Sequence, residues 1–209
     1  MSTTESSEQF WETFYSSGRG RWSGKPNPSL VEEVSGLRPG SALDLGCGQG
    51  ADAIWLALQG WQVTAVDVSA AALEVAARAA EAAGVADAPG TIVWDRRDIA
   101  DALPAGSFDL VAATFLHSPV EGFPRTRVLR EAAATVAPGG TLLIVGHAPS
   151  DAHPELEFPS PEETIAELAL VPDEWQVRTS VLREQQHAFR DEAPTQRVDS
   201  VVRLERAGG

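Results

Sequence analysis

Three glycines at alternate positions closely follow an aspartate in the segment Leu43-Asp44-Leu45-Gly46-Cys47-Gly48-Gln49-Gly50. A strand-like stretch precedes them and a helical stretch follows. Because glycine has no side chain, this loop can turn tightly and bring its backbone against a ligand. The N-terminus of the following helix adds free N–H groups and a partial positive charge. The pattern predicts a nucleoside-containing ligand over Gly46, Gly48 and Gly50, with Cys47 as a small apolar filler of the loop.

Asp44 distinguishes two classes of ligand for this loop. NAD or FAD is one alternative, because Gly46, Gly48 and Ala51 satisfy the G-x-G-x-x-G/A pattern and Asp67 lies about 20 residues further on. A carboxylate at Asp44, however, would repel a pyrophosphate. It would attract the ammonium of an amino-acid moiety, such as that of S-adenosylmethionine. We therefore expect S-adenosylmethionine as the cofactor and S-adenosyl-L-homocysteine as its product.

Acidic residues after the next two strands extend the predicted cofactor site. Asp67 ends a strand and can accept hydrogen bonds from both ribose hydroxyls. The alternative role is N-cap of the next helix, for which Ser69 is better placed. Asp98 is the expected acceptor for the adenine amine, with the Ile99 backbone N–H on a ring nitrogen, and Asp95 is the rival acceptor. The full predicted set is Trp22, Asp44, Gly46, Cys47, Gly48, Gly50, Asp67, Val68, Asp98, Ile99 and Phe115.

Two histidines follow later strands and are the candidate catalytic residues. His117 lies after the strand at 108–113, and His147 follows the strand at 141–145. Each is a candidate base or substrate contact, and each has the alternative role of a hydrogen-bonded packing residue. A thiolate or similar soft nucleophile needs no base, whereas an amine or hydroxyl more often does. Since no two histidines share a metal-ligand spacing on a helix, we expect no metal.

Alternating strands and helices must position these residues, which predicts an α/β fold with helices on both faces of a mostly parallel sheet. We expect Pro138-Gly139-Gly140 to end a helix, and two consecutive strands at the end of the chain to form an antiparallel hairpin. The aromatic residues Phe10, Phe14 and Tyr15 have helical spacing, typical of packing, while Trp22 is a candidate lid over the cofactor. The expected strands are 42–45, 62–67, 91–94, 108–113, 141–145, 175–181 and 197–204. The expected helices after the N-terminal one are 28 to about 36, 53–58, 70–83, 125–136 and 160 to about 170.

Length and charge limit the classes of partner. The 209 residues, 43% of them hydrophobic, fit one domain over 1–209 with residues 1–27 as a helix and cover segment. A net charge of −14 disfavours nucleic acid and anionic membranes. A single cysteine provides neither a disulfide nor a structural zinc site, and no apolar run could cross a bilayer. We expect a cytoplasmic monomer or homodimer acting on a small molecule.

These residues together resemble the class I methyltransferase family. Leu43 to Gly50 is similar to its glycine-rich motif, Val63 to Asp67 to its acidic second motif, and Asp98-Ile99 to its adenine site. The resemblance implies a Rossmann-like, doubly wound seven-stranded sheet of order 3-2-1-4-5-7-6 with strand 7 antiparallel. It places the cofactor across the carboxyl ends of strands 1 and 2. The segment from Trp22 to Asn27 also resembles small bacterial methyltransferases of the tellurite-resistance and thiopurine type, which favours soft nucleophiles.

Two other classes of function stay open at this point. An NAD(P)-dependent oxidoreductase would need a proton donor such as Tyr-x-x-x-Lys, yet the only tyrosine is Tyr15 and the only lysine is Lys25. A non-catalytic cofactor-binding module would keep Asp44 and Asp67 but lack an acceptor pocket. Methylation of nucleic-acid bases is disfavoured, because Phe115-Leu116-His117-Ser118-Pro119 stands where an Asn/Asp-Pro-Pro-Tyr/Phe motif would lie.

Overall fold

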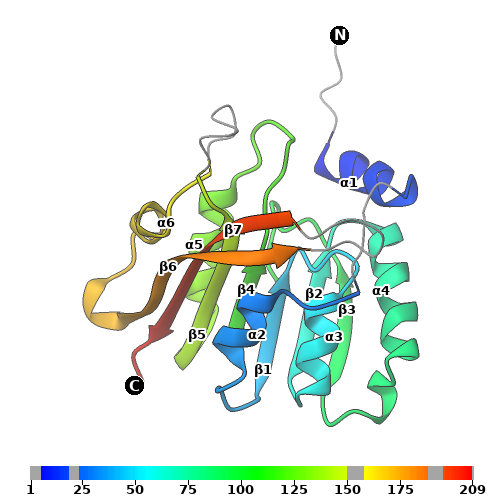
Figure 1. The fold of residues 1–209 in the computed structure, drawn as a ribbon, viewed down its shortest axis with the longest axis horizontal. Coiled ribbons are helices and arrows are strands. Elements are labelled where there is room, and N and C mark those ends of the chain that lie inside the picture. Colours follow the sequence, from blue (N-terminus) through cyan, green and yellow to red (C-terminus); the bar gives the residue numbers. More distant parts are fainter. Residues whose placement is uncertain (1–5, 19–23, 150–157, 188–194, 209) are drawn as a thin grey trace.

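Seven strands of the computed structural model form one mixed sheet in the order β3-β2-β1-β4-β5-β7-β6 (Figure 1). The structure describes residues 6–18, 24–149, 158–187 and 195–208. The strands are β1 (Ser41–Leu45), β2 (Gln62–Asp67), β3 (Thr91–Arg96), β4 (Phe108–Thr114), β5 (Val136–His147), β6 (Trp175–His187) and β7 (Thr195–Arg206). The helices are α1 (Ser7–Ser16), α2 (Pro28–Val34), α3 (Ala51–Leu58), α4 (Ala70–Ala82), α5 (Arg125–Ala134) and α6 (Pro161–Leu168), with short turns η1 (Val85–Asp87) and η2 (Pro172–Glu174). The predicted strand order is confirmed.

Strand direction brings the predicted site residues to one edge of the sheet. β1 pairs in parallel with β2 and β4, and β4 pairs in parallel with β5. β7 runs antiparallel to both β5 and β6, which confirms the expected hairpin, although its strands are longer than predicted. Because the carboxyl ends of parallel strands meet at the same edge, the loops after β1, β2, β3, β4 and β5 lie together.

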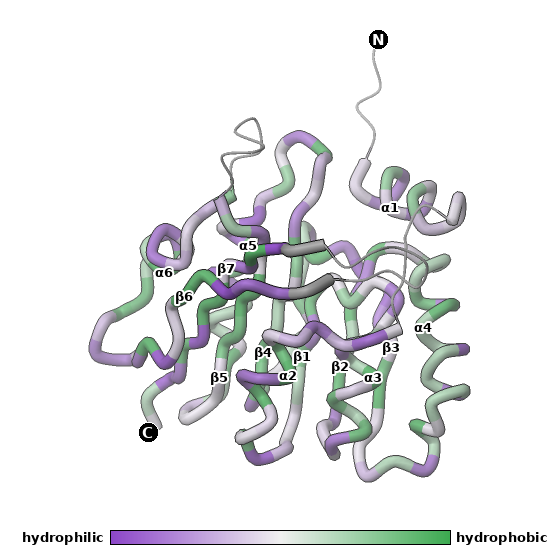
Figure 2. The backbone as a smooth tube through the Cα atoms, in the orientation of Figure 1, coloured by the Kyte–Doolittle hydropathy of each residue, from purple (hydrophilic) through white to green (hydrophobic). Residues whose placement is uncertain are grey.

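Two hydrophobic layers hold the helices against the sheet. Successive residues of β1 point to opposite faces of the sheet. Leu43 packs in the layer under α5 and α6, and Ala42 packs in the layer under α2 and α3. In Figure 2, hydrophilic and hydrophobic residues alternate along α4, as expected for a helix with one face on a sheet. Within the described ranges, no helix combines the length and hydrophobicity that a membrane span needs.

The segment around Pro138 corrects one prediction. α5 ends at Ala134 rather than at 136. Thr135 caps its C-terminus and donates its hydroxyl to the Ala132 carbonyl oxygen. Val136 already pairs with Phe108, so the Pro138-Gly139-Gly140 stretch lies inside β5 instead of ending the helix. The β4–β5 register shifts between Phe108 and Leu110, and this irregularity accommodates the proline and glycines.

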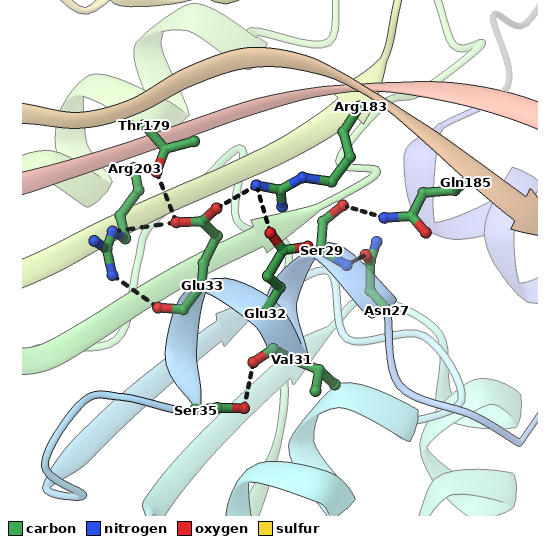
Figure 3. Close-up of polar contacts among 10 residues, drawn as sticks. All are labelled: Asn27, Ser29, Val31, Glu32, Glu33, Ser35, Thr179, Arg183, Gln185 and Arg203. Carbon is green, nitrogen blue, oxygen red and sulfur yellow. Dashed lines mark hydrogen bonds and ion pairs between the residues drawn. The ribbon is translucent and has the colours of Figure 1, made fainter.

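A buried ionic cluster ties α2 to the β6–β7 hairpin (Figure 3). The Glu33 side chain is only 7% exposed and contacts Arg183 at 2.6 Å and Arg203 at 3.3 Å. Thr179 donates its hydroxyl to the same carboxylate at 2.7 Å. Glu32 reaches Arg183 from the exposed side of α2, at 3.3 Å. These contacts connect elements far apart in sequence, so no local pattern indicates them.

Candidate active site

The glycine loop between β1 and α3 has positive φ angles, a backbone conformation that glycine adopts readily and other residues rarely do. Gly46, Gly48 and Gly50 have φ angles of 68°, 53° and 82°. A Cβ on Gly48 would lie 2.8 Å from the Tyr15 hydroxyl oxygen. A Cβ on Gly50 would lie 2.7 Å from the Trp94 ring, so this third glycine serves the packing of α3 against β3. Of the three glycines, Gly46 lies on the wall of the pocket, whereas Gly48 lies against Tyr15 and Gly50 holds the loop in place.

A pocket opens above this loop, with about 560 Å³ of space including its mouth. α1 contributes one wall, the segments after β2 and β3 a second, and the segment after β4 a third. Of the predicted site residues, those on its wall are Gly46, Asp67, Val68, Asp98, Ile99, Phe115 and His117; the wall also contains Ser7, Trp11, Tyr15, Val66, Arg97, Leu116, Ser118 and Phe123. Trp22 lies outside the described residues.

Asp67 lies on the pocket wall and is 8% exposed. Its Oδ2 accepts the Gly48 N–H at 2.8 Å and its Oδ1 accepts the Ser69 N–H at 2.9 Å. Ser69 caps α4 by accepting the Ala72 N–H, so the N-cap alternative for Asp67 does not hold. Burial raises the pKa of Asp67, while its backbone hydrogen bonds oppose that shift. The carboxylate thus links the glycine loop to the end of β2.

The two acids after β3 differ in their surroundings. Asp98 lies on the pocket wall and its Oδ1 accepts the Ala100 N–H at 2.8 Å. Asp95 instead pairs with Arg97 at 2.9 Å and is not on the wall. Ile99, 7% exposed, adjoins Asp98 on the same wall. This arrangement supports the prediction that Asp98, rather than Asp95, meets the adenine amine.

A pair of buried acids lies beneath the loop, and sequence reasoning found only one of them. Asp44 is 1% exposed, and its Oδ2 has no hydrogen-bond partner among the residues that the structure describes. Asp52, in the first turn of α3, accepts the Asn27 N–H at 2.6 Å and the Thr114 hydroxyl at 2.7 Å. Burial raises the pKa of Asp44 well above its usual value, and the charges of Asp52 and Asp67 add to this. An unsatisfied buried carboxylate fits the ammonium group of the expected cofactor.

Cys47 shows no sign of a reactive thiol. The residue is half-buried, and its Sγ lies 3.8 Å from the Gly48 carbonyl oxygen. Burial raises the pKa of the thiol well above its usual value, and Asp44 and Asp67 add to this. The side chain therefore acts as the predicted filler of the loop.

The two histidines stack on each other, but only His117 is on the pocket wall. Their ring centroids are 5.6 Å apart, and Phe158 lies 5.0 Å from each ring. Burial lowers the pKa of His117 to about 4, with further lowering by Arg125 and His147, so the imidazole is neutral at pH 7. His147 lies behind it, 4.7 Å from Phe115. The geometry favours His117 as the substrate-facing histidine and His147 as its packing partner.

α1 forms a roof over the pocket rather than a part of the core. None of its residues is buried, yet Trp11 and Tyr15 line the pocket. Glu12 accepts the Ser69 hydroxyl at 2.8 Å and the Ala71 N–H at 3.2 Å, at the start of α4. Glu8 pairs with Arg96 at 2.6 Å. Aromatic residues at helical spacing are typical of packing, so the predicted cofactor site contains neither Trp11 nor Tyr15.

The sheet order, the glycine loop and the acid ending β2 define a Rossmann-like protein of the class I S-adenosylmethionine-dependent methyltransferases. Residues 42–140, which are 99 of the 209 residues, match the family model described as a methyltransferase domain, and this segment is a methyltransferase domain of that family. The matched residues contain β1 from Ala42 onward, the glycine loop, β2, β3 and β4. They also contain Asp67 at the end of β2 and Asp98 after β3. The cofactor of this family is S-adenosylmethionine.

Similar proteins include a curated relative, ribosomal RNA small subunit methyltransferase C of Chromohalobacter salexigens. It is 33% identical over 124 residues, which are 58% of this chain and 34% of that protein. The chain spans between 11% and 37% of the length of the curated relatives it matches.

Solved structures share the fold over nearly the whole chain. One comes from work on the conversion of a disulfide bond into a thioacetal group during echinomycin biosynthesis, with a TM-score of 0.74, 23% identity and coverage of 96% of this chain and 93% of that one. TehB from Haemophilus influenzae has a TM-score of 0.68 at 19% identity, covering 94% and 67%. NodS from Bradyrhizobium japonicum, in complex with S-adenosyl-L-homocysteine, has a TM-score of 0.67 at 19% identity, covering 93% and 98%. At these identities, the likeness shows the fold.

Proposed function

We propose that this protein transfers a methyl group from S-adenosylmethionine to a small-molecule nucleophile, with a soft nucleophile such as a thiol favoured. The observation that carries this proposal is one continuous pocket that runs from Asp67 and Asp98 to His117. Such a pocket offers a cofactor half and an acceptor half in contact with each other. A non-catalytic cofactor-binding module would need only the first half.

The cofactor half supplies a partner for each polar part of the cofactor. Asp44 would take the ammonium group, Asp67 the ribose hydroxyls, and Asp98 with the Ile99 N–H the adenine ring. The backbone of Gly46 and Gly48 would face the amino-acid portion. When bound, S-adenosylmethionine supplies an electrophilic methyl group on a positively charged sulfur. A pyrophosphate, as in NAD, would meet Asp44 and Asp67 and no cation on the loop.

The acceptor half is mostly apolar. Phe115, Leu116 and Phe123 line it beside His117. Methyl transfer to an uncharged or anionic nucleophile removes the sulfonium charge, and a dry site favours the less polar transition state. His117 is neutral at pH 7, so it can accept a proton from an acceptor that must lose one. Holding the nucleophile in line with the methyl carbon supplies much of the rate.

The size and charge of the site favour a small acceptor. The pocket holds about 560 Å³ of space including its mouth, and the chain carries a net charge of −14. The curated relative named for ribosomal RNA methylation makes RNA the competing acceptor class. A phosphate backbone would meet a strongly acidic protein, which opposes binding.

Calorimetric titration with S-adenosylmethionine and, separately, with NADH tests the proposal. We expect the sulfonium cofactor alone to bind at micromolar level and Asp67→Ala to weaken it by at least ~10-fold, since hydrogen bonds to a charged acceptor are lost. Asp95→Ala, which removes an acid outside the pocket, is the matched control and should bind normally. A preference for NADH, or no cofactor binding, would contradict the proposal. An acceptor screen that begins with thiols would follow.

A further inference from the structure

Asp52 is a buried carboxylate to which the proposed function assigns no role in cofactor binding or methyl transfer. It sits in the first turn of α3, directly after the glycine loop, and is 8% exposed. Both of its oxygens accept neutral donors: the Asn27 N–H at 2.6 Å and the Thr114 hydroxyl at 2.7 Å. Asn27 caps the start of α2, Asp52 lies in the first turn of α3, and Thr114 ends β4. Asp52 therefore fixes the point where three parts of the site meet.

Asp44 has the opposite environment. It is 1% exposed, and its Oδ2 has no donor within the described residues. The titratable groups that face it from other elements are Asp52 on α3 and Asp67 at the end of β2, and the Cys47 thiol lies close by on the loop. All are acidic. Two carboxylates this deeply buried, each acting on the other's charge, cannot both ionise cheaply without a cation between them.

We propose that the pair Asp44 and Asp52 holds one proton, on Asp44, when the cofactor is absent, and that an ammonium group binding at Asp44 displaces this proton to solvent. Asp52 is then a positioning residue of the cofactor site: its charge, held by two hydrogen bonds, makes Asp44 selective for a cation. This inference rests on the proposed function, because the ammonium is that of S-adenosylmethionine.

The proton balance of the step is simple. In the free protein Asp44 is a carboxylic acid, because it has no donor, and Asp52 is a carboxylate, because it has two. The ligand arrives with its ammonium already charged. After binding, both carboxylates are ionised and the ammonium retains all its protons. One proton leaves for each ligand bound, and Asp44 and Asp52 then place two negative charges beside one positive charge, while Asp67 keeps its hydrogen bonds to the Gly48 and Ser69 N–H groups.

The test is calorimetry at pH 7 in buffers of different ionisation enthalpy. S-adenosyl-L-homocysteine carries the ammonium without the sulfonium, and 5′-methylthioadenosine lacks the amino-acid moiety altogether. We expect release of about one proton per S-adenosyl-L-homocysteine bound and none for 5′-methylthioadenosine. Affinity for S-adenosyl-L-homocysteine should then fall about tenfold per pH unit below the range where the pair ionises.

Asp52→Asn is the informative variant, because asparagine has the same shape and can still meet Asn27 and Thr114. Removal of the Asp52 charge takes away one cause of the raised Asp44 pKa, although burial still raises it, so proton release at pH 7 should be smaller than in the wild type while binding persists. Asp109→Asn is the matched control: Asp109 lies at the far end of β4, where it accepts the Ser41 N–H, and its variant should release protons as the wild type does. Thr114→Val gives a second check that keeps both acids. Loss of one donor to Asp52 should extend proton release to higher pH.

The outcomes separate this inference from the proposed function. Binding of S-adenosyl-L-homocysteine with no proton release, equal release in Asp52→Asn, or equal release with 5′-methylthioadenosine would each overturn the proton held on Asp44 and leave the methyltransferase proposal standing. Absence of S-adenosyl-L-homocysteine binding to the wild-type protein would overturn the proposed function itself.

Discussion

His117 lines the pocket as a neutral imidazole whose buried Nε2 has no partner in the described part of the chain. Its pKa is about 4 in the folded protein, below the ordinary value of 6.5. Between these two pH values the unfolded chain binds more protons than the folded one, so stability falls as the pH drops through this window. The contribution of His117 is complete above pH 6.5.

Thermal or denaturant unfolding at pH 7.5 and pH 5 measures this effect. We expect His117→Asn to lose about 1 kcal/mol less than the wild type over this interval, after allowance for the part of the ring that solvent reaches. His147, whose pKa is also lowered by burial, is present in both proteins and cancels. Equal losses in the two proteins would show that His117 does not titrate in this range.

Substitution of His117 should also separate acceptors by their chemistry. For an acceptor that must lose a proton at neutral pH, His117→Ala should lower kcat by about 100-fold, because general base catalysis is removed. For a thiol already ionised at the assay pH, the effect should be within a few-fold. Steady-state rates with a matched thiol and alcohol or amine measure the difference. Equal losses for both would assign His117 to acceptor binding instead.

At the scale of elements, the buried ionic cluster decides how firmly α2 holds the hairpin. Glu33→Ala would leave Arg183 and Arg203 without their buried partner, which should lower the free energy of unfolding by about 3 kcal/mol. Glu32 is the matched control, since its side chain is 62% exposed although it contacts the same Arg183. Glu32→Ala should cost less than about 1 kcal/mol. Denaturant titration of both variants measures the contrast, and similar losses would contradict it.

Local patterns in the sequence predicted most of the helices and strands, and some of the residues of the candidate site. The Asn27-Pro28 start of α2, the Ser160 capping box of α6 and the acid at the end of β2 depend on neighbouring residues, and the structure shows all three elements starting or ending there. Asp44 and Asp67 were predicted because a motif surrounds them. Asp52 and Glu33 were not, because their partners come from other elements.

The errors have a similar physical origin. Pro138-Gly139-Gly140 has the composition of a helix stop, and pairing with β4 instead draws it into β5. The aromatic spacing of α1 predicts a helix but not what the helix covers. Its polar contacts with Arg96 and the start of α4 hold the helix where Trp11 and Tyr15 line the pocket.

At the scale of the whole molecule, the net charge of −14 separates the two candidate acceptor classes. Binding to RNA grows with the number of phosphates that cations neutralise. We expect no measurable binding of a fluorescent RNA hairpin at ~150 mM salt, by anisotropy, and only weak binding at low salt. Tight binding with a steep salt dependence would instead favour the RNA acceptor suggested by the curated relative.

The anchoring of α1 has a consequence for the order of events in turnover. Its polar contacts are made with Arg96 and with Ser69 at the start of α4, two residues from Asp98 and from Asp67 respectively. The roof therefore closes over one compartment, while Phe115, His117 and Phe123 border the other. A reaction in such a site should be sequential and ordered, with the cofactor first to enter and last to leave. Product inhibition by S-adenosyl-L-homocysteine should then be competitive toward S-adenosylmethionine and non-competitive toward the acceptor, and the acceptors should exchange through the side of the molecule that α1 leaves uncovered.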